Sequence, residues 1–448
     1  MFTVWIDEDR RPDRGAMMTG GMSADASIGP GAKTPAARKP ERKRAARRDL
    51  LLNEAARQIN AQGAGAIVLN DIAEQVGLSR NALYYYVADR ADLVFRCYLR
   101  ACEAMTDDLV AAHEQGRGAA ERLRLFIERS LAFDQPGQAV LSDVDFLPEP
   151  QRGLIRAHQD RNMAALCGMI AEGTAQGEFR PCQTEIAAQA LIGILAWARL
   201  SAGWLGYRDG RAARKRMIAV VCELVLQGIG TASTTPHFRV DANALVAKPY
   251  NAFDRRQTND IKITQLIAAA SRVFNRRGID GGSLDEIGAA VGATRGAVYH
   301  YFDDKADLVV RCYRRAFELY DIFMDTAVAQ GRTGFERAMI TLHLNVQAQA
   351  GALSPLMPQP GRMTLPPDDL AAFSQAARKL RLTTTRNLRQ GVTDGSCRPC
   401  DFTFMAEIGA GVFLWLPKWL PDDYPLSPLD IADEITDLFA LGLERRAA

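Results

Sequence analysis

The sequence predicts an all-α protein made of two fused copies of one unit. Residues 51–98 align without a gap on residues 266–313 at a shift of 215, and about 21 of the 48 pairs are identical. Apolar residues recur with the helical period of 3.6 in nearly every periodic segment, and strand-like alternation of Val, Ile and Thr is missing. A repeat of this length is too long for a solenoid unit and fits a whole domain.

The two copies match again further along the chain, after a three-residue slip to a shift of 218. The matched pairs are Gly173 and Gly391, Gly177 and Gly395, Gly193 and Gly411, and Trp197 and Trp415, together with Arg-Pro-Cys at 180–182 and 398–400. Each half is therefore a complete copy, and the chain is two related proteins joined head to tail.

Apolar spacing and turn residues place the helices in each copy. In the first copy we expect helices at 44–62, 70–76, 80–87, 90–115, 183–206 and 210–229. In the second copy we expect them at 259–277, 285–291, 295–302, 305–330, 401–416 and 429–444. Gly63 is suited to end the first helix because glycine adopts the left-handed cap conformation.

Composition divides the chain into six parts. Residues 231–257 carry Ser, Thr, Pro, Asn and Asp without a long apolar stripe, which indicates a linker. We expect a disordered basic tail at 1–43, helix-turn-helix domains at 44–106 and 258–320, helical regulatory domains at 107–230 and 321–446, and the linker at 231–257.

The net charge of +2 says little, whereas the distribution of charge is informative. Seven basic residues lie between Arg38 and Arg48 against the single acid Glu41. A solvated helix start explains such a run, and an arm that contacts phosphate explains it equally well.

Eight scattered cysteines without a dense framework favour a reduced, cytoplasmic chain. Cys397 and Cys400 have the spacing of a metal knuckle, but a second pair is missing, so we expect neither a metal nor another cofactor. The longest apolar stretches, near 186–206 and 408–420, contain polar or charged residues and are expected to be buried helices, not membrane spans.

The strongest functional signal is the segment 69–87. Leu69, Ile72 and Val76 form one apolar face of a short helix, Gly77 permits a sharp turn, and Ser79 is a suitable N-cap for the next helix. This spacing predicts a helix-turn-helix motif, and the second copy repeats it.

The helical spacing also predicts which side chains of the second helix face outward. They are Arg80, Asn81, Tyr84 and Tyr85 in the first copy and Arg295, Gly296, Tyr299 and His300 in the second. Arginine pairs with guanine, asparagine pairs with adenine, and tyrosine hydroxyls donate to phosphate. The hydroxyls of Ser79 and Thr294 add phosphate contacts at the helix N-terminus, and Arg90 and Lys305 are placed to hold the DNA backbone.

At these residues the sequence resembles the TetR family of transcriptional regulators. Segments 79–90 and 294–305 resemble that family's recognition helix and the start of its fourth helix, and the resemblance covers nearly all of 44–446. It implies that Tyr84 and Tyr299 contact phosphate, that Tyr85 and His300 face the bases, and that Arg90 and Lys305 are phosphate anchors. The full predicted DNA-binding set is Ser79, Arg80, Asn81, Tyr84, Tyr85, Tyr86 and Arg90, with Thr294, Arg295, Gly296, Tyr299, His300, Tyr301 and Lys305.

The resemblance further implies that the rest of each half is a sensor domain for a small-molecule effector, whose last two helices pair with another subunit. Helices 183–206 with 210–229, and 401–416 with 429–444, occupy those positions and carry Trp197 and Trp415. Core packing explains each tryptophan better than ligand stacking. The Pro-rich stretches 136–150 and 355–367 are either pocket-mouth loops or ordinary connectors, and the ligand-binding residues stay unassigned.

The expected function is that of a sequence-specific DNA-binding regulator acting on a double-stranded operator, in the manner of a ligand-responsive repressor. Family members are usually homodimers, so this tandem chain is either an intramolecular pseudo-dimer or a homodimer with four reading heads. A rival is a small-molecule-binding or enzymatic protein whose reading heads have lost function. The sequence offers no Ser-His-Asp set, phosphate loop or metal cluster, so we expect no enzymatic activity.

Overall fold

The computed structural model describes residues 35–132, 137–204, 210–231, 237–247, 251, 253–358 and 365–446, and only the backbone at 35–42 and 202–204. Within these residues every regular element is a helix, and the β-type pairings are two isolated bridges. The all-α prediction is confirmed. Residues 1–34 of the predicted disordered tail lie outside the described part of the chain.

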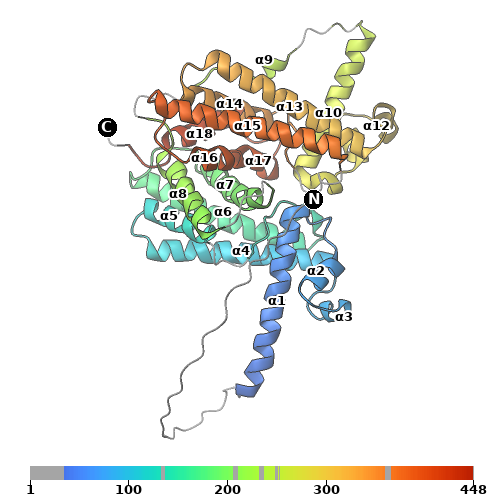
Figure 1. Cartoon of the computed structure of the whole chain (residues 1–448), viewed down its shortest axis with the longest axis vertical. Helices are drawn as coiled ribbons and strands as arrows, with labels where there is room; N and C mark the ends of the chain where they lie inside the picture. The colour runs from blue at the N-terminus through green and yellow to red at the C-terminus, as the bar shows by residue number, and fades with distance from the viewer. Residues whose placement is uncertain are drawn as a thin grey trace, which may run out of the picture. The chain divides into compact units, whose positions relative to one another are not determined.

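Each copy contributes a similar series of helices (Figure 1). The first copy contains α1 (Pro35–Gln62), α2 (Leu69–Gln75), α3 (Arg80–Leu83), α4 (Arg90–Gln115), α5 (Ala119–Ser130), the short 3₁₀ helix η1 (Val144–Phe146), α6 (Gln151–Ala175), α7 (Thr184–Trp204) and α8 (Arg211–Gln227). After α9 (Ala242–Val246), the second copy contains α10 (Arg255–Gly281), α11 (Leu284–Ala290), α12 (Arg295–Tyr301), α13 (Lys305–Gln330), α14 (Gly334–Ala350), α15 (Pro367–Thr393), α16 (Phe402–Ile408), α17 (Gly411–Trp419) and α18 (Pro428–Leu441).

Several of the predicted helices differ from the structure, among them 259–277, which is α10 at 255–281, and 429–444, which is α18 at 428–441. Helix α1 begins at Pro35, so residues 35–43 are helical and not part of a disordered tail. Helix α3 ends at Leu83 because the next amides, of Tyr85 and Tyr86, bond to carbonyls three residues back in the tighter 3₁₀ manner. The helix predicted at 401–416 divides into α16 and α17, where the Ala410 amide likewise bonds three residues back, to the Glu407 carbonyl.

The four helices at the start of each copy enclose a small core, and we call these two helix-turn-helix bodies the first and second heads. Both cores use the same positions of the repeat. The equivalent buried pairs are Leu51 and Leu266, Ile59 and Phe274, Ile72 and Ile287, Leu83 and Val298, and Leu93 and Leu308. A fully buried side chain of this size stabilises a fold by about 1.5–3 kcal/mol, so each head has its own apolar support.

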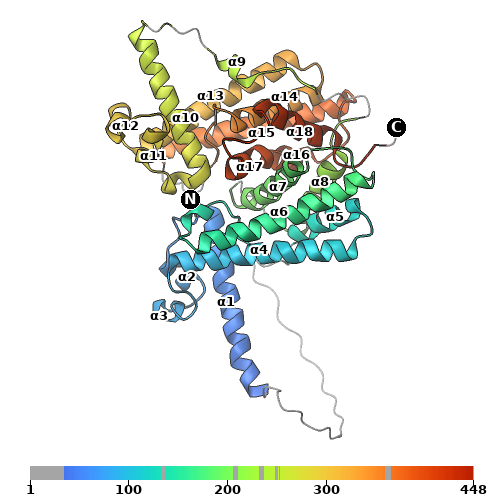
Figure 2. The ribbon, with the colours of Figure 1, turned by 180° about the vertical axis from the view of Figure 1, so that it is seen from behind.

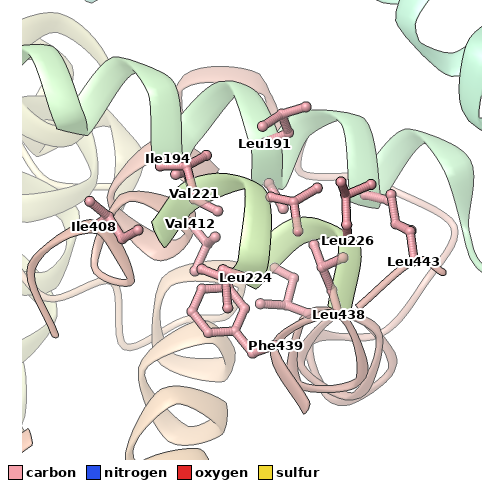
Figure 3. Close-up of a cluster of buried hydrophobic side chains, with 14 of the residues drawn as sticks. Leu191, Ile194, Val221, Leu224, Leu226, Ile408, Val412, Leu438, Phe439 and Leu443 are labelled. Atoms are coloured by element: carbon pink, nitrogen blue, oxygen red, sulfur yellow. The ribbon is translucent and has the colours of Figure 1, made fainter. Parts of the chain in front are cut away.

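The largest core joins the two copies. Helices α7 and α8 of the first copy pack with α16, α17 and α18 of the second, and Figure 3 shows Leu191 and Val221 beside Val412 and Phe439. Helices α7 and α17 come closest at Gly193 and Gly411, where a Cβ built on either glycine would lie 2.5–2.6 Å from the other's carbonyl oxygen. Because Gly193 and Gly411 are equivalent residues, the two copies contact each other here through the same part of their surfaces.

The tryptophans seen in the sequence stand on either side of this crossing. The indole Nε1 of Trp197 donates to the Glu407 carbonyl at 2.9 Å, and that of Trp415 donates to the Gln189 side chain at 3.3 Å. Residues 189 and 407 are equivalent, so the two hydrogen bonds join equivalent pairs of residues, one through a main-chain carbonyl and one through a side chain. The division between α16 and α17 lies at residues 409–410, shortly after Glu407.

The ends of the two copies also exchange contacts. The Arg180 amide donates to the Leu443 carbonyl and the Arg398 amide donates to the Ile229 carbonyl, both at 2.8 Å. The two isolated β-bridges pair Phe179 with Glu444 and Gly230 with Cys397. Each Arg-Pro-Cys segment is therefore hydrogen-bonded to the last residues of the other copy.

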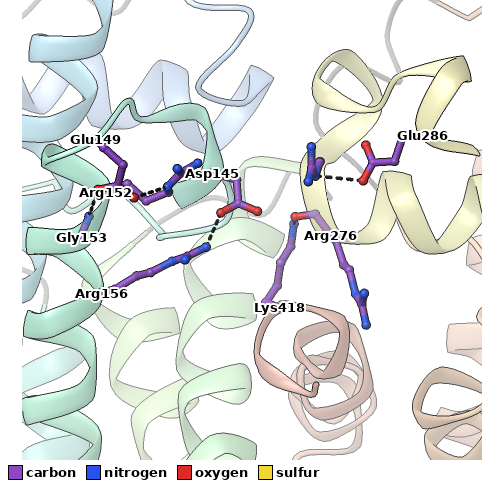
Figure 4. A network of polar contacts seen from close by, with 9 residues as sticks. Asp145, Glu149, Arg152, Gly153, Arg156, Arg276, Glu286 and Lys418 are labelled. Atoms are coloured by element: carbon purple, nitrogen blue, oxygen red, sulfur yellow. Dashed lines mark hydrogen bonds and ion pairs between the residues drawn. The ribbon is translucent and has the colours of Figure 1, made fainter. Parts of the chain in front are cut away.

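The heads are joined near their bases as well. A Cβ on Gly65, after α1, would lie 3.7 Å from the Cβ of its equivalent Asp280. The Lys418 ammonium of α17 donates to the Arg276 carbonyl at 3.2 Å (Figure 4). It also lies 3.9 Å from Asp143 of the first copy. Burial lowers the pKa of Lys418, and Asp143 offsets part of this effect.

The predicted linker contains structure that its composition did not indicate. Helix α9 packs on α13 and α14 (Figure 2), where Gln347 donates to the Val240 carbonyl at 2.7 Å and accepts from the Ala242 amide at 3.1 Å. Gln347 also bonds to Nδ1 of the fully buried His343, whose Nε2 lies 2.8 Å from Asp433 of α18. The sequence assigned His343 no role, whereas the structure places it under the linker.

Protonation of His343 is expected to destabilise the fold. Burial lowers the pKa of His343 below its usual 6.5, against the opposing effect of Asp433, so the unfolded chain binds this proton more readily. The contribution of His343 to stability is full above pH 6.5 and decreases as the pH falls below it, by at most about 1.4 kcal/mol per pH unit. Urea unfolding at pH 7.5 and 5.5 should show a smaller loss at pH 5.5 for His343→Gln than for the unchanged chain. Equal losses in both proteins would contradict this role.

Candidate nucleic-acid interface

The first head holds its recognition helix through local capping and turn bonds. Gly77 has a φ of 66°, which permits the turn, and the Leu78 amide closes it on the Ala73 carbonyl at 2.8 Å. The Ser79 hydroxyl then accepts from the Ala82 amide at 3.2 Å and caps α3. The predicted turn residue and N-cap residue therefore have the roles that the sequence indicated.

The second head repeats this geometry with different residues. Gly292 has a φ of 67°, the Ala293 amide bonds to the Gly288 carbonyl at 2.8 Å, and the Thr294 hydroxyl accepts from the Ala297 amide at 3.3 Å. The next helices are also capped alike: Asp89 accepts from the Asp92 amide and Asp304 from the Asp307 amide, both at 2.8 Å. The two heads are thus locally equivalent bodies.

The outward residues predicted for both recognition helices are exposed. The side chain of Tyr85 is 77% exposed, and those of Tyr84 and Tyr299 are 48% and 47% exposed. The remaining exposed members of the predicted DNA-binding set are Ser79, Arg80, Asn81, Arg90, Thr294, Arg295, Gly296 and His300. Large aromatic side chains on a surface that carries arginine suit a partner with both phosphates and flat bases.

Tyr86, Tyr301 and Lys305 are half-buried, unlike the other members of the set. Tyr86 and Tyr301 pack against the cores of their own heads. The two tyrosines position the recognition helices through these contacts, and their direct contact with DNA stays a prediction.

The two recognition arginines, Arg80 and Arg295, are not equally free of contacts with the protein's own acidic side chains. In the second head, Arg295 lies 3.5 Å from Asp285, donates to the Tyr299 hydroxyl at 3.5 Å, and has its guanidinium 5.6 Å from the Tyr299 ring centre. The Tyr299 hydroxyl, followed by Asp285, raises the pKa of Arg295. In the first head the position of Asp285 is taken by uncharged Asn70, so Arg80 has no acid there. Binding of a phosphate or guanine to Arg295 has to compete with Asp285.

The two predicted phosphate anchors bind the protein backbone at equivalent places. Arg90 donates to the Gly65 carbonyl at 2.8 Å, and Lys305 donates to the Asp280 carbonyl at 3.4 Å. The Arg90 guanidinium also lies 5.2 Å from the Phe146 ring centre, while burial lowers the pKa of half-buried Lys305. These residues brace the loop that follows the first helix of each head, a role that the sequence did not indicate.

A pair of asparagines, also missed by the sequence, connects each head to its regulatory part. Asn60 donates to the Gln138 carbonyl at 2.9 Å and accepts from the Val140 amide at 2.8 Å. Its equivalent, Asn275, donates to the Pro355 carbonyl and accepts from the Met357 amide, both at 2.9 Å. The sequence feature that could have indicated this contact is an asparagine at the same position of the repeat in both copies, on helices whose neighbouring residues are apolar.

The cysteine spacing that suggested a metal has another explanation. Burial raises the pKa of the Cys397 thiol to about 12 and that of Cys400 to about 11, which favours neutral thiols over metal-binding thiolates. Within the described residues, no three His, Cys, Asp or Glu side chains are grouped so that they could hold a metal ion. Cys397 instead lies in the β-bridge to Gly230. Among the helices that the structure describes, none has the length and apolarity needed to cross a membrane.

The geometry defines a protein with two helix-turn-helix heads and a shared helical core. Residues 51–97 and 266–312 match the model for bacterial regulatory proteins of the tetR family, and residues 116–229 and 337–443 match the tetracyclin repressor-like C-terminal domain. These four segments cover most of the chain, and the same pair of domains occurs twice. The chain therefore belongs to the TetR family as a tandem member.

Curated relatives match over one head-sized segment. The chain is 40% identical over 57 residues to the HTH-type transcriptional regulator TtgR of Pseudomonas putida, covering 13% of this chain and 27% of that protein. It is 38% identical over 63 residues to the HTH-type transcriptional repressor BepR of Brucella suis, covering 14% and 30%. The chain thus spans between a quarter and a third of the length of these relatives.

Solved structures match at lower identity. The TetR family regulator PfmR of Thermus thermophilus is 22% identical, with 39% of this chain and 97% of that chain covered and a TM-score of 0.30. The ketosteroid transcriptional regulator KstR2 of Mycobacterium tuberculosis is 19% identical, with 39% and 93% covered and a TM-score of 0.33.

Proposed function

We propose that this chain is a sequence-specific, ligand-responsive transcriptional repressor in which one polypeptide supplies both DNA-reading heads. The observation that carries the proposal is the duplicated surface: an exposed Arg-x-x-x-Tyr face follows a glycine turn at Arg80 and Tyr84 and again at Arg295 and Tyr299. The packing of a head's core does not explain an exposed arginine and tyrosine on its surface. It explains the recurrence of these residues in both heads even less well. Family membership adds to the same conclusion.

The division of labour follows the predicted domains. Residues 44–106 and 258–320 would read DNA, and residues 107–230 and 321–446 would sense an effector and hold the copies together. The linker at 231–257 makes the second copy continuous with the first. A tether of this kind replaces concentration-dependent pairing with an effective concentration on the order of millimolar.

The contacts between copies support one chain acting as a pseudo-dimer. The close crossing of Gly193 and Gly411 and the paired bonds of Trp197 and Trp415 use, within one chain, the surfaces that would otherwise join two subunits. In a two-fold arrangement, recognition helices read half-sites about 34–36 Å apart, or one helical turn of DNA.

The heads differ at the residues that would read bases. Asn81 corresponds to Gly296, and Tyr85 corresponds to His300. Asparagine pairs with adenine through two hydrogen bonds, whereas glycine has no side chain with which to read a base. We therefore expect the operator to contain two unlike half-sites.

Selection from a random duplex pool at low ionic strength tests the proposal. We expect enriched duplexes with two different half-sites centred about 10–10.5 base pairs apart, each bound by one chain in size-exclusion chromatography with light scattering. Each half-site doubled into a palindrome should bind more weakly than the selected operator. Affinity should also fall steeply as salt rises, because phosphate contacts release counterions.

The two rivals give different results. A homodimer with four heads would place two chains on each selected duplex. A small-molecule-binding protein with non-functional heads would give no enrichment, or binding that hardly responds to salt. Equal affinity for the two palindromes would contradict the unlike half-sites while leaving DNA binding intact.

A further inference from the structure

The regulatory part of the second copy encloses a cavity of about 440 Å³. Its walls come from α13, α14, α15, α16 and α17, together with the segment 356–358. Trp197 and Ile229 of the first copy also line it. The cavity therefore lies next to the crossing of α7 and α17, where the copies meet.

The walls are mainly aromatic and apolar. The Phe317 and Phe373 rings are stacked with centres 5.7 Å apart, and Tyr313 lies 4.9 Å from Phe373. Among these walls, Oδ1 of Asn345, a residue only 5% exposed, has no hydrogen-bond partner within the protein. Its Nδ2 donates to the Thr341 carbonyl at 2.8 Å, which fixes the orientation of the amide. A buried acceptor without a donor costs about 1–3 kcal/mol, so a ligand that donates to it gains affinity.

In the first copy, charged groups lie around Ser130, the residue equivalent to Asn345. Arg129 pairs with buried Asp108 at 3.1 Å, and Arg199 donates to the carbonyl of Ser130, the equivalent of Asn345, at 2.7 Å. Burial lowers the pKa of Arg199 to about 10, with Asp108 opposing the shift. In the second copy the positions of Asp108, Arg129 and Arg199 carry the uncharged Phe323, Leu344 and Pro417, none of which lines the cavity. The lining residue Asn345 corresponds to Ser130, so an apolar molecule entering the first copy beside Ser130 would meet the Arg199 guanidinium instead of an amide acceptor.

One wall of the cavity is also the support of the second head. Met357 lines the cavity, and its amide donates to Asn275 of α10 at 2.9 Å. The Tyr313 hydroxyl donates to the Met357 carbonyl and the Tyr320 hydroxyl contacts its sulfur, at 3.4 and 3.3 Å. A molecule that displaces Met357 or these tyrosines therefore acts directly on the helix that begins the second head.

We propose that each chain takes up one effector, in the second copy only, and that this effector is an apolar ring compound with a hydroxyl or amine that donates to Asn345. Binding acts on the second head through Met357 and Asn275, with Trp197 of the first copy closing the site. The inference rests on the proposed function for the regulatory outcome, while the binding itself is independent of DNA.

Isothermal titration calorimetry of the full chain with 2-naphthol, and with naphthalene as the probe that lacks the hydroxyl, tests the site without DNA. We expect one 2-naphthol per chain, bound about two- to tenfold more tightly than naphthalene, the ratio that one net hydrogen bond gives. Asn345→Leu should remove this ratio, and the matched change in the first copy, Ser130→Ala, should preserve it. Should Asn345→Leu fail to fold, Asn345→Ala also deletes the acceptor, with less added apolar bulk, and should also remove the ratio.

Two equal sites per chain, no binding of either probe, or a ratio unaffected by Asn345→Leu and Asn345→Ala would overturn the proposal. Regulation is measured separately, as the affinity of the chain for its selected operator with and without saturating 2-naphthol. We expect weaker DNA binding with the probe and less weakening in Asn275→Ala. Binding of 2-naphthol by a chain that binds no operator would reject the proposed function and keep the site, whereas operator binding without any uptake of the probe would reject the site alone.

Discussion

Gly193→Ala is expected to destabilise the protein by about 1–3 kcal/mol, the usual cost of overpacking, although alanine is the better helix former. The added Cβ would lie 2.6 Å from the Gly411 carbonyl oxygen and 2.7 Å from the Cβ of Trp415. Neither atom moves without displacing α17, so the helices must separate and release part of the shared core. Urea unfolding followed by circular dichroism should show a lower midpoint.

Gly168→Ala is the matched control, because Gly168 also lies inside a long helix. A Cβ at Gly168 would meet nothing within 4 Å, and the residue is exposed. Removal of glycine's extra freedom in the unfolded chain should stabilise this variant by up to about 1 kcal/mol. The two substitutions are chemically identical and should change stability in opposite directions. If Gly193→Ala also stabilised the chain, the close crossing of α7 and α17 would be wrong.

The sequence predicted those features that depend on local chemistry. Helices α4 and α13 have the predicted bounds, 90–115 and 305–330, because Asp89 and Asp304 cap their starts and a glycine follows each end. The glycine turns and hydroxyl caps of the recognition helices likewise follow from neighbouring residues.

The sequence did not predict contacts between distant segments. The contact of Trp197 with the Glu407 carbonyl joins positions more than 200 residues apart, whereas the break between α16 and α17 is marked locally by Gly409 and Gly411. The role of Asn275 depends in the same way on a loop 80 residues further along. His343 was left unassigned because its partners, Gln347 and Asp433, lie on two helices and become neighbours only through folding.

The exposure of the predicted DNA-binding residues follows from helical geometry, but their roles do not. The sequence treats Arg80 and Arg295 alike, and the structure adds the acid Asp285 beside Arg295 only. It also places Arg90 and Lys305 on backbone carbonyls, so that a loss of DNA affinity on changing either residue would have two causes. Variants of the recognition arginines therefore test DNA binding more directly than variants of the anchors.

Charge reversal in either head is expected to reduce affinity for the selected operator by about 10²–10⁴-fold, the advantage that two tethered binding modules have over one. Arg80→Glu disables the first head, and Arg295→Glu disables the second. Both side chains are exposed, so the fold should survive the change. Because the same chain supplies both heads, unchanged protein should not exchange subunits with the variant, and the variant's own affinity for the operator should stay reduced. Fluorescence anisotropy with the labelled operator provides the measurement.

Arg211→Glu is the control with the same change of charge, because Arg211 is exposed at the start of α8, outside both heads. Its effect on affinity should be small, since a single surface charge away from the DNA acts only through a screened field. If Arg80→Glu bound the operator like the unchanged chain while Arg295→Glu lost affinity, the first head would not read DNA. The opposite result would show that the second head does not read DNA. A similar loss in both variants requires both heads on one duplex, and the light-scattering mass of that complex then shows that they come from one chain.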